Sequence, residues 1–289
     1  MNPRSLPRLR DGLVRHLTNP DAAVRTETGA DNWTALDTLA RNAQEAGLFW
    51  VSEDMAALAV SAGRQLDDAC WSVEARPAPA GLLLFDGGVG TIAAGTGARR
   101  VEIPVEACTW GPHPHGCMVW LLISRQRLQR EIDPNVELIV ERTPPLIPIW
   151  GAVLDTAKPV PMTEIESKSR AVVAALAAAW LLMAQPTLVE TGQERAPGKV
   201  RRSYTRAGRP EPEITLVHLR RPYTDHSTAA PDHEPTRRYK HRWVVSGHWR
   251  NQSYGPGRSR RRRQWIPAYI KGPDGAPMLA RERVNVWRR

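Results

Sequence analysis

The residues best suited to chemistry lie between Tyr239 and Ile270, where arginines are interleaved with aromatic side chains. This stretch contains the sequence Gly-His-Trp-Arg at residues 247–250, a Gly-Pro-Gly loop at 255–257, and four consecutive arginines at 260–263. Guanidinium groups bind phosphates, and flat aromatic rings stack on unpaired bases. The pattern therefore predicts a nucleic-acid-binding region, and we expect its ligand to be RNA.

The predicted contacts are the cationic and aromatic side chains of this stretch. An arginine can bind a phosphate through two hydrogen bonds and can also stack on a base. Trp265 has two possible roles on sequence alone: it could stack on a base, or it could belong to the core of a small sheet. The candidates are Arg242, Trp243, His248, Trp249, Arg250, Tyr254, Arg258, Arg260, Arg261, Arg262, Arg263 and Trp265.

The charge of the chain is divided unevenly along its length. From Arg195 onward there are 23 Lys and Arg against 7 Asp and Glu, whereas the first 194 residues hold 17 basic and 23 acidic side chains. All five tyrosines also lie after residue 200. Such an asymmetry indicates a polyanion-binding region attached to a mildly acidic remainder.

Two other functions remain open for the basic region. A metal-independent ribonuclease needs a proton-transfer group and a cation beside the phosphate, which His248, Arg250 and Tyr254 would supply. A DNA-binding regulator is the other, although no helix-turn-helix pattern is recognisable in the basic half. We favour binding without catalysis.

The sequence predicts no cofactor. The glycines from Gly87 to Gly97 do not have the spacing of a phosphate-binding loop, and no lysine follows Gly95. Two cysteines and two histidines could in principle ligate zinc, although a Gly/Pro loop above buried thiols is the favoured interpretation. These weak metal candidates are Cys108, His113, His115 and Cys117.

Hydrophobic periodicity predicts an α+β fold with four regions. Residues 1–75 have helical spacing, and 76–190 are expected to form a central antiparallel sheet packed on a long apolar helix at 164–185. That helix is expected to begin with a capping box formed by Thr163 and Glu166. Residues 82–85 and 89–93 are predicted to pair as a hairpin. A basic linker is expected at 191–212, followed at 213–289 by a small basic antiparallel sheet.

Cysteine content and hydropathy predict a cytoplasmic protein with no membrane partner. Three cysteines do not make a disulfide framework. The first ten residues lack the apolar segment of a signal peptide. The longest apolar run, at 171–184, is about six residues short of the roughly 20 that span a bilayer.

The basic stretch resembles the family of type V-A anti-CRISPR proteins that lower production of the type V effector nuclease. Gly247, His248 and Trp249 match the first part of the family's motif, residues 254–255 loosely match its aromatic loop, and Trp265 with Pro267 matches its end. Two positions depart from the pattern, because Ser246 stands where the family has arginine and Arg250 stands where it has a second histidine.

The resemblance implies a phage or mobile-element protein that acts in a bacterial host cell. It implies recognition of a protein target as a nascent peptide at the ribosome, followed by loss of the encoding mRNA. In that picture the body of the protein would bind the peptide, and the basic region would contact RNA or the ribosome.

Overall fold

The computed structural model describes residues 2–21, 33–66, 70–71, 73–95, 100–132, 143–155, 160–220, 243–267 and 269–271. The chain separates into two compact units, Met1–Arg220 and Arg221–Arg289. We refer to the first as the body and to the second as the C-terminal unit. The boundary differs from the expected linker at 191–212, because those residues are built into the body.

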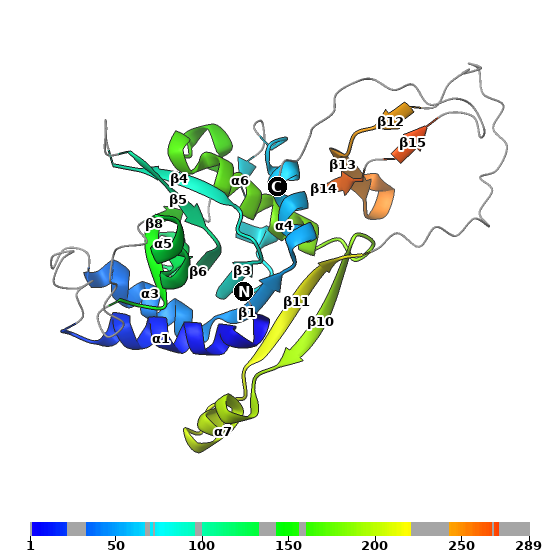
Figure 1. Cartoon of the computed structure of the whole chain (residues 1–289). Coiled ribbons are helices and arrows are strands. Elements are labelled where there is room, and N and C mark those ends of the chain that lie inside the picture. The colour runs from blue at the N-terminus through cyan, green and yellow to red at the C-terminus, as the bar shows by residue number, and fades with distance from the viewer. Residues whose placement is uncertain are drawn as a thin grey trace, which may run out of the picture. The chain divides into compact units, whose positions relative to one another are not determined.

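The body is organised around a seven-stranded mixed sheet (Figure 1). It is antiparallel from β3 through β8, as expected, and β1 adds parallel pairings to β3 and to β11. In spatial order the strands are β10 (Val189–Arg195), β11 (Glu213–Leu219), β1 (Gly47–Val51), β3 (Gly81–Phe85), β6 (Ala107–His113), β7 (Gly116–Ser124) and β8 (Leu146–Leu154).

Helices cover both faces of this sheet. On one face, α1 (Leu6–Thr18) and α3 (Trp33–Glu45) bury their apolar sides against Leu48, Leu82 and Leu84. The other face carries α4 (Glu53–Gly63) and α6 (Ser167–Met183). Alternate residues of a strand point to opposite faces, so a strand between two helical layers must be apolar throughout, and all five residues of β3 are buried.

Helix α6 is the apolar core helix that the sequence predicts. Eleven of its residues are buried, and the Trp180 ring packs against Trp110 and Trp71 at centroid distances of 5.1 and 5.2 Å. The expected capping box does not form, because the helix starts at Ser167 with Glu166 as its N-cap and no side-chain cap. Residues 162–164 instead form a short 3-10 helix, η5 (Met162–Glu164).

Two strand predictions in the body need correction. The expected hairpin between residues 82–85 and 89–93 does not exist, because β3 lies in the large sheet and β4 (Gly90–Ala94) pairs with β5 (Val101–Val105). Gly87 and Gly88, both at positive φ, redirect the chain between them. In addition, β1 interrupts the region 1–75, which was predicted to be helical.

The segment 191–212 completes β10 and then forms α7 (Gly198–Arg206), which joins β10 to β11. The small basic sheet expected at 213–289 begins later than predicted, because residues 213–219 join the large sheet as β11. Residues 136–142 and 283–288 lie outside the described residues. Five short elements complete the described part of the body: η1 (Pro3–Ser5), β2 (Cys70–Trp71) with β9 (Val160–Pro161), η3 (Val73–Ala75) and α5 (Arg125–Glu131).

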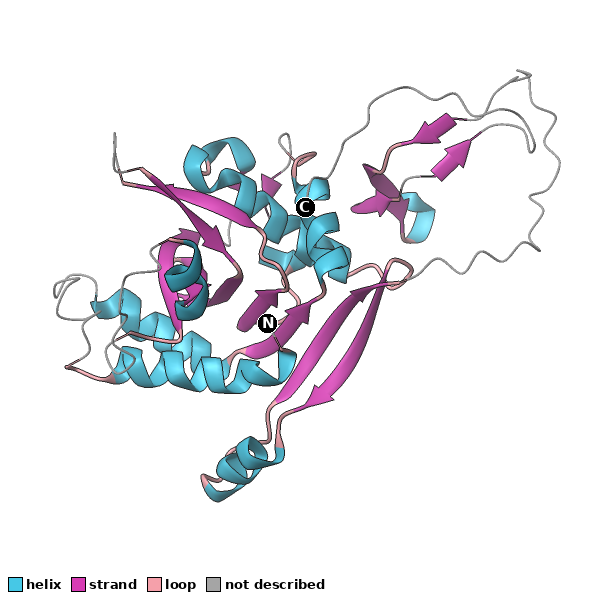
Figure 2. Ribbon diagram, in the orientation of Figure 1, coloured by secondary structure: helices cyan, strands magenta, loops and turns pink. Residues whose placement is uncertain are grey.

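The described part of the C-terminal unit consists of two antiparallel strand pairs. β12 (Trp243–Val245) pairs with β15 (Tyr269–Lys271), and β13 (His248–Tyr254) pairs with β14 (Arg260–Ile266). Helices and strands both contribute substantially to the fold, which confirms the α+β class (Figure 2). Within the described ranges, no helix combines the length and the apolarity that a bilayer crossing requires.

Candidate nucleic-acid interface

Most of the predicted contact residues lie on one element, the β13–β14 hairpin (residues 248–266). Its register pairs His248 with Ile266 and Tyr254 with Arg260. Seven paired positions extend over about 23 Å of strand. Because side chains alternate between the two faces, this register determines which candidates can contact the same ligand.

One face of the hairpin is strongly cationic. His248, Arg250 and Tyr254 share it with Arg260 and Arg262, and each of these five side chains is exposed. The guanidinium carbon of Arg262 lies 5.5 Å from the centre of the Tyr254 ring. A cation over an aromatic face at this distance is attractive. The face thus presents cations together with an aromatic ring, which is the combination that single-stranded nucleic acids require.

The opposite face contains a structural tryptophan pair. The rings of Trp249 and Trp265 meet edge to face with centroids 5.2 Å apart. Trp265 is only 4% exposed, so it cannot offer its ring to a base, and the interpretation of Trp265 as a hairpin core residue holds. Trp249 is partly exposed. Arg261 and Arg263 lie further along the same face.

The turn of the hairpin holds Arg258 in an uncommon conformation. Gly255 and Gly257 have φ values of 77° and 59°, and Arg258 has a φ of 55°. Left-handed backbone costs a residue with a side chain about 1–2 kcal/mol. Ser259 Oγ donates a hydrogen bond of 3.0 Å to the Pro256 carbonyl and stabilises the 3-10 turn η6 (Pro256–Arg258). The exposed Arg258 side chain therefore stands at the tip.

Among the residues that the structure describes, no carboxylate forms an ion pair with an arginine of the hairpin. Residues 243–267 contain six arginines and no Asp or Glu. In the part of the chain that the structure describes, the ion pairs all involve other side chains. The arginines repel one another, so an anionic partner is expected to stabilise them.

For two of the predicted nucleic-acid contacts, the structure does not describe the side chain. Arg242 lies outside the described residues, and for Trp243 the structure gives the backbone, which pairs with Lys271 in β12–β15. The other ten candidates all lie on the hairpin or its turn.

The residues considered for catalysis share a face but do not converge. His248 Nδ1 lies 3.2 Å from the Ser246 carbonyl oxygen. Tyr254 is six positions further along the strand, which corresponds to about 20 Å. One phosphodiester group cannot contact both side chains. The trio His248, Arg250 and Tyr254 is therefore not assembled as a catalytic centre.

The two cysteines among the weak metal candidates lie apart from each other. In the register of β6 and β7, Cys108 lies opposite Leu121, and Cys117 lies opposite Pro112. The two thiols are therefore four residue positions apart along the strands. Burial raises the pKa of both thiols, whereas a metal ligand must be a thiolate. His113 and His115 face each other with ring centroids 5.6 Å apart. Among the described residues no group of three or more His, Cys, Asp or Glu could hold a metal ion.

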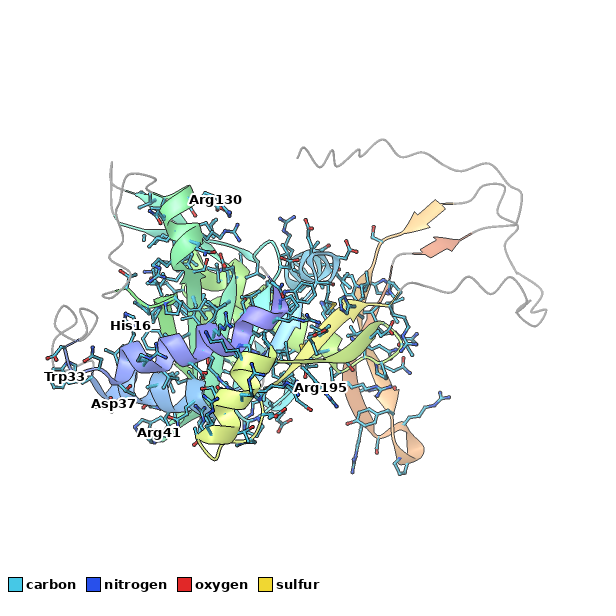
Figure 3. The ribbon with its side chains drawn as sticks, turned by 60° about the horizontal axis from the view of Figure 1, so that its bottom comes forward. His16, Trp33, Asp37, Arg41, Arg130 and Arg195 are labelled. Carbon is cyan, nitrogen blue, oxygen red and sulfur yellow. The ribbon has the colours of Figure 1, made fainter. Side chains whose placement is uncertain are left out.

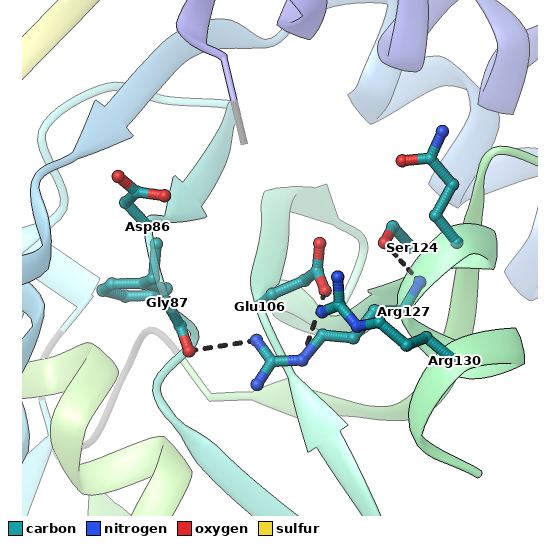
Figure 4. A pocket seen from close by; sticks show the side chains of 8 residues that line it. Asp86, Gly87, Glu106, Ser124, Arg127 and Arg130 are labelled. Atoms are coloured by element: carbon teal, nitrogen blue, oxygen red, sulfur yellow. Dashed lines mark hydrogen bonds and ion pairs between the residues drawn. The ribbon is translucent and has the colours of Figure 1, made fainter. Parts of the chain in front are cut away.

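Sequence reasoning did not find a polar cleft in the body. It has a volume of ≈ 350 Å³ and lies where β3 ends, opposite α5. Glu106 is 5% exposed, and its carboxylate lies 3.7 Å from Arg127 Nε. Arg127 Nη1 donates a hydrogen bond to the Gly87 carbonyl, which bridges the cleft (Figure 4). A buried carboxylate within an otherwise apolar pattern, Val105-Glu106-Ala107, is the sequence signal that could have indicated it.

A buried polar cluster on the other side of the body was also missed. The Tyr204 hydroxyl donates to Asp11 and accepts from Arg10, while Arg10 Nη1 donates to the Ala46 carbonyl. Burial and the Asp11 hydrogen bond raise the pKa of Tyr204. Arg10 and Asp11 are 193 or more residues from Tyr204 in sequence, so no local pattern could reveal the cluster.

Comparison with known proteins gives one family. The model of the AcrVA2-like family, the anti-CRISPR type V subtype A2 family, matches residues 110–272. This range is more than half of the 289 residues and includes the whole β13–β14 hairpin. The chain is also similar to the crystal structure of AcrVA2, at 14% identity and a TM-score of 0.39, over 93% of this chain and 86% of that one. No curated protein matches the sequence.

Proposed function

We propose that this protein, which belongs to the AcrVA2-like family of type V subtype A2 anti-CRISPR proteins, is an adaptor with two binding surfaces. In this proposal the body recognises a protein or a nascent peptide, and the C-terminal unit binds RNA or the ribosome. Holding both together in the bacterial cytoplasm reduces expression of the target. The protein performs no catalysis of its own.

The observation that carries the RNA-binding part is the set of exposed arginines on the β13–β14 hairpin, which form no ion pair with a carboxylate of the described residues. Five exposed arginines lie on its strands and turn: Arg250, Arg258, Arg260, Arg261 and Arg262. Tyr254 adds a ring beside Arg262. A backbone of phosphates with accessible bases fits this surface, because the cations bind phosphates while a ring stacks on a base.

The polar cleft supports the protein-binding part. Its lining includes Asp86, Glu106 and Arg127, so it offers both hydrogen-bond acceptors and donors within one concave surface. A peptide carries donors and acceptors in alternation along its backbone. A cleft of mixed polarity is better suited to a peptide than to a polyanion.

A binding assay with full-length protein tests the RNA-binding part. The variant changes Arg260, Arg261, Arg262 and Arg263 to Gln, and a fluorescent single-stranded RNA reports affinity by anisotropy. A matched control changes four basic residues of the body to Gln: Arg41, Arg64, Arg100 and Lys168. We expect the hairpin variant to lose at least about tenfold in affinity and the control to lose little. Equal losses would show that only net charge matters and would refute the proposal.

A ribonuclease centred on His248 is the alternative that the same samples can exclude. His248 and Arg250 are exposed on the same face, and this observation favours testing for ribonuclease activity. The RNA recovered from the wild-type protein is run on a denaturing gel. Adaptor function requires intact RNA, whereas cleavage that His248→Ala abolishes would establish an enzyme.

Duplex DNA is the remaining competitor for the hairpin. A β-ribbon can enter the major groove of DNA, so a regulator remains a defined alternative. The adaptor proposal requires single-stranded RNA to compete with the labelled probe more effectively than duplex DNA of equal charge. The reverse order would favour a DNA-binding regulator.

A further inference from the structure

Helix α7 is held against α1 by one side only. Val200 and Tyr204, four residues apart, are both buried and belong to the same core cluster as Leu6 and Leu13. The hydrogen bond from Tyr204 to Asp11 adds a polar lock. Because rotation of α7 about its axis would break these contacts, the same residues always face outward.

The outward side of α7 is a basic face formed by Lys199, Arg202 and Arg206. At about 100° per residue these three side chains lie within an arc of roughly 60°. All three are exposed. Among the described residues, the ion pair that α7 makes is that of Arg201 with Glu211, on another side of the helix.

This arrangement works against the stability of the helix itself. Like charges three and four residues apart on a helix repel each other. Lys199 also lies in the first turn, where a cation opposes the helix dipole. Residues 198–206 contain no acidic side chain. The helix forms because Val200 and Tyr204 are buried, so its charge has no structural role that the contacts reveal.

The spacing of the basic face suits a phosphate backbone. Seven residues of helix separate Lys199 from Arg206, which corresponds to about 10 Å along the axis. A nucleic-acid strand carries one negative charge at every phosphate of its backbone. A row of three cations about 10 Å long can therefore contact consecutive phosphates of one strand.

A groove beside α7 extends the basic surface. It has a volume of ≈ 320 Å³ and runs between α1 and α7, with Arg15 and Arg209 in its lining. The Arg209 guanidinium carbon lies 4.4 Å from the centre of the Tyr204 ring, which holds the side chain in place. In Figure 3, α7 lies beside α1 on the side of the body that is turned forward.

We propose that the basic face of α7 is a second RNA-binding surface, formed by the body and distinct in sequence from the β13–β14 hairpin of the C-terminal unit. Lys199, Arg202 and Arg206 bind consecutive phosphates, and Arg15 and Arg209 bind at the adjoining groove. That the polymer is RNA rests on the proposed function. The location of the surface rests on α7 alone.

The test uses full-length protein and a single-stranded RNA probe. The variant carries Lys199→Gln, Arg202→Gln and Arg206→Gln, and the matched control carries Arg41→Gln, Arg64→Gln and Lys168→Gln. We expect the α7 variant to bind about tenfold or more weakly than wild type, and the control to stay within about twofold of wild type. An α7 variant that binds like the control overturns the proposal.

Two further measurements keep the result interpretable. A variant with Arg202→Lys and Arg206→Lys keeps the charges, so it should bind within a fewfold of wild type; a loss equal to that of the Gln variant would indicate a folding defect and overturn the phosphate-binding role. Polyglutamate is added as competitor: displacement equal to that by RNA, charge for charge, would assign the face to acidic proteins.

Failure of this inference can be told apart from failure of the proposed function. If the hairpin variant loses RNA and the α7 variant does not, only the second surface is wrong. If wild-type protein does not bind RNA at all, the proposed function is wrong as well.

Discussion

Single residues decide which face of the β13–β14 hairpin is free. Trp265 is buried against Trp249, and a Cβ added at Gly247 would lie 2.6 Å from Cζ2 of the Trp265 ring. The absence of a side chain at Gly247 therefore lets the Trp265 indole pack closely against the backbone at residue 247. The tryptophan pair turns Arg250, Arg260 and Arg262 to the other face.

We predict that Gly247→Ala destabilises the hairpin by about 1–3 kcal/mol, because the indole must leave its position. Amide hydrogen exchange of residues 248–266 would report the loss as faster exchange. Gly192→Ala is the control, since nothing lies within 4 Å of a Cβ there. Unchanged exchange in the Gly247 variant would contradict the packing described for Trp265.

A second prediction concerns Tyr204, whose hydroxyl connects Arg10 and Asp11. Tyr204→Phe should cost about 1–3 kcal/mol in the free energy of unfolding, because buried partners lose a hydrogen bond. The control Tyr254→Phe alters an exposed side chain and should have little effect. Urea unfolding measures both. Equal effects would show that the cluster contributes nothing specific to stability.

The same residue gives a pH dependence. Burial, with the Asp11 hydrogen bond, raises the pKa of Tyr204 above that of an unfolded tyrosine. The folded state holds the phenol proton more tightly, so this contribution is fully present below about pH 10 and is lost as pH rises through the folded pKa. Stability of wild type should therefore fall more steeply above pH ~10 than that of Tyr204→Phe. Parallel curves would contradict this.

At the scale of elements, α4 and α6 are packed closely enough to contact through their backbones. A Cβ at Gly63 would lie 2.7 Å from the Ala175 nitrogen, which is a backbone atom and cannot rotate away. Gly63→Ala is expected to cost about 1–3 kcal/mol, as measured by thermal or urea unfolding. Gly198→Ala, at a helix start with open space around it, should be neutral or slightly stabilising. A neutral Gly63→Ala would show that the helices are not in close contact.

Elements with a strong local pattern could be predicted from the sequence, and those defined by distant pairing could not. The α6 helix is apolar on nearly every side, and the α+β class follows from periodicity. The sequence did not predict β1, whose partners β3 and β11 lie far along the chain. It also did not predict β10 or α7. The arginines at 191–212 suggested an exposed linker, whereas the buried side chains of Val200 and Tyr204 fix that segment to the core of the body. For the site, composition predicted the residues, and only the register separated Trp265 from the exposed side chains.

At the scale of the whole molecule, the body contains a complete core. The cluster that joins α1, α3, the sheet and α7 lies entirely within residues 1–220. We expect a protein truncated after Arg220 to unfold at the same urea concentration as the body of the full-length chain. A marked drop in stability would show that the C-terminal unit is required for the fold of the body.

The central claim is that the arginines of the β13–β14 hairpin bind phosphates. The most direct test measures single-stranded RNA affinity of wild type and of the variant with Arg260–Arg263 changed to Gln, between about 50 and 200 mM salt. Arg260 and Arg262 lie on the same face of the hairpin, and their two phosphate contacts should make the dependence of log K on log salt steeper for wild type than for the variant by about 1.4, a difference of roughly sevenfold over this range. Parallel lines for the two proteins would contradict the claim.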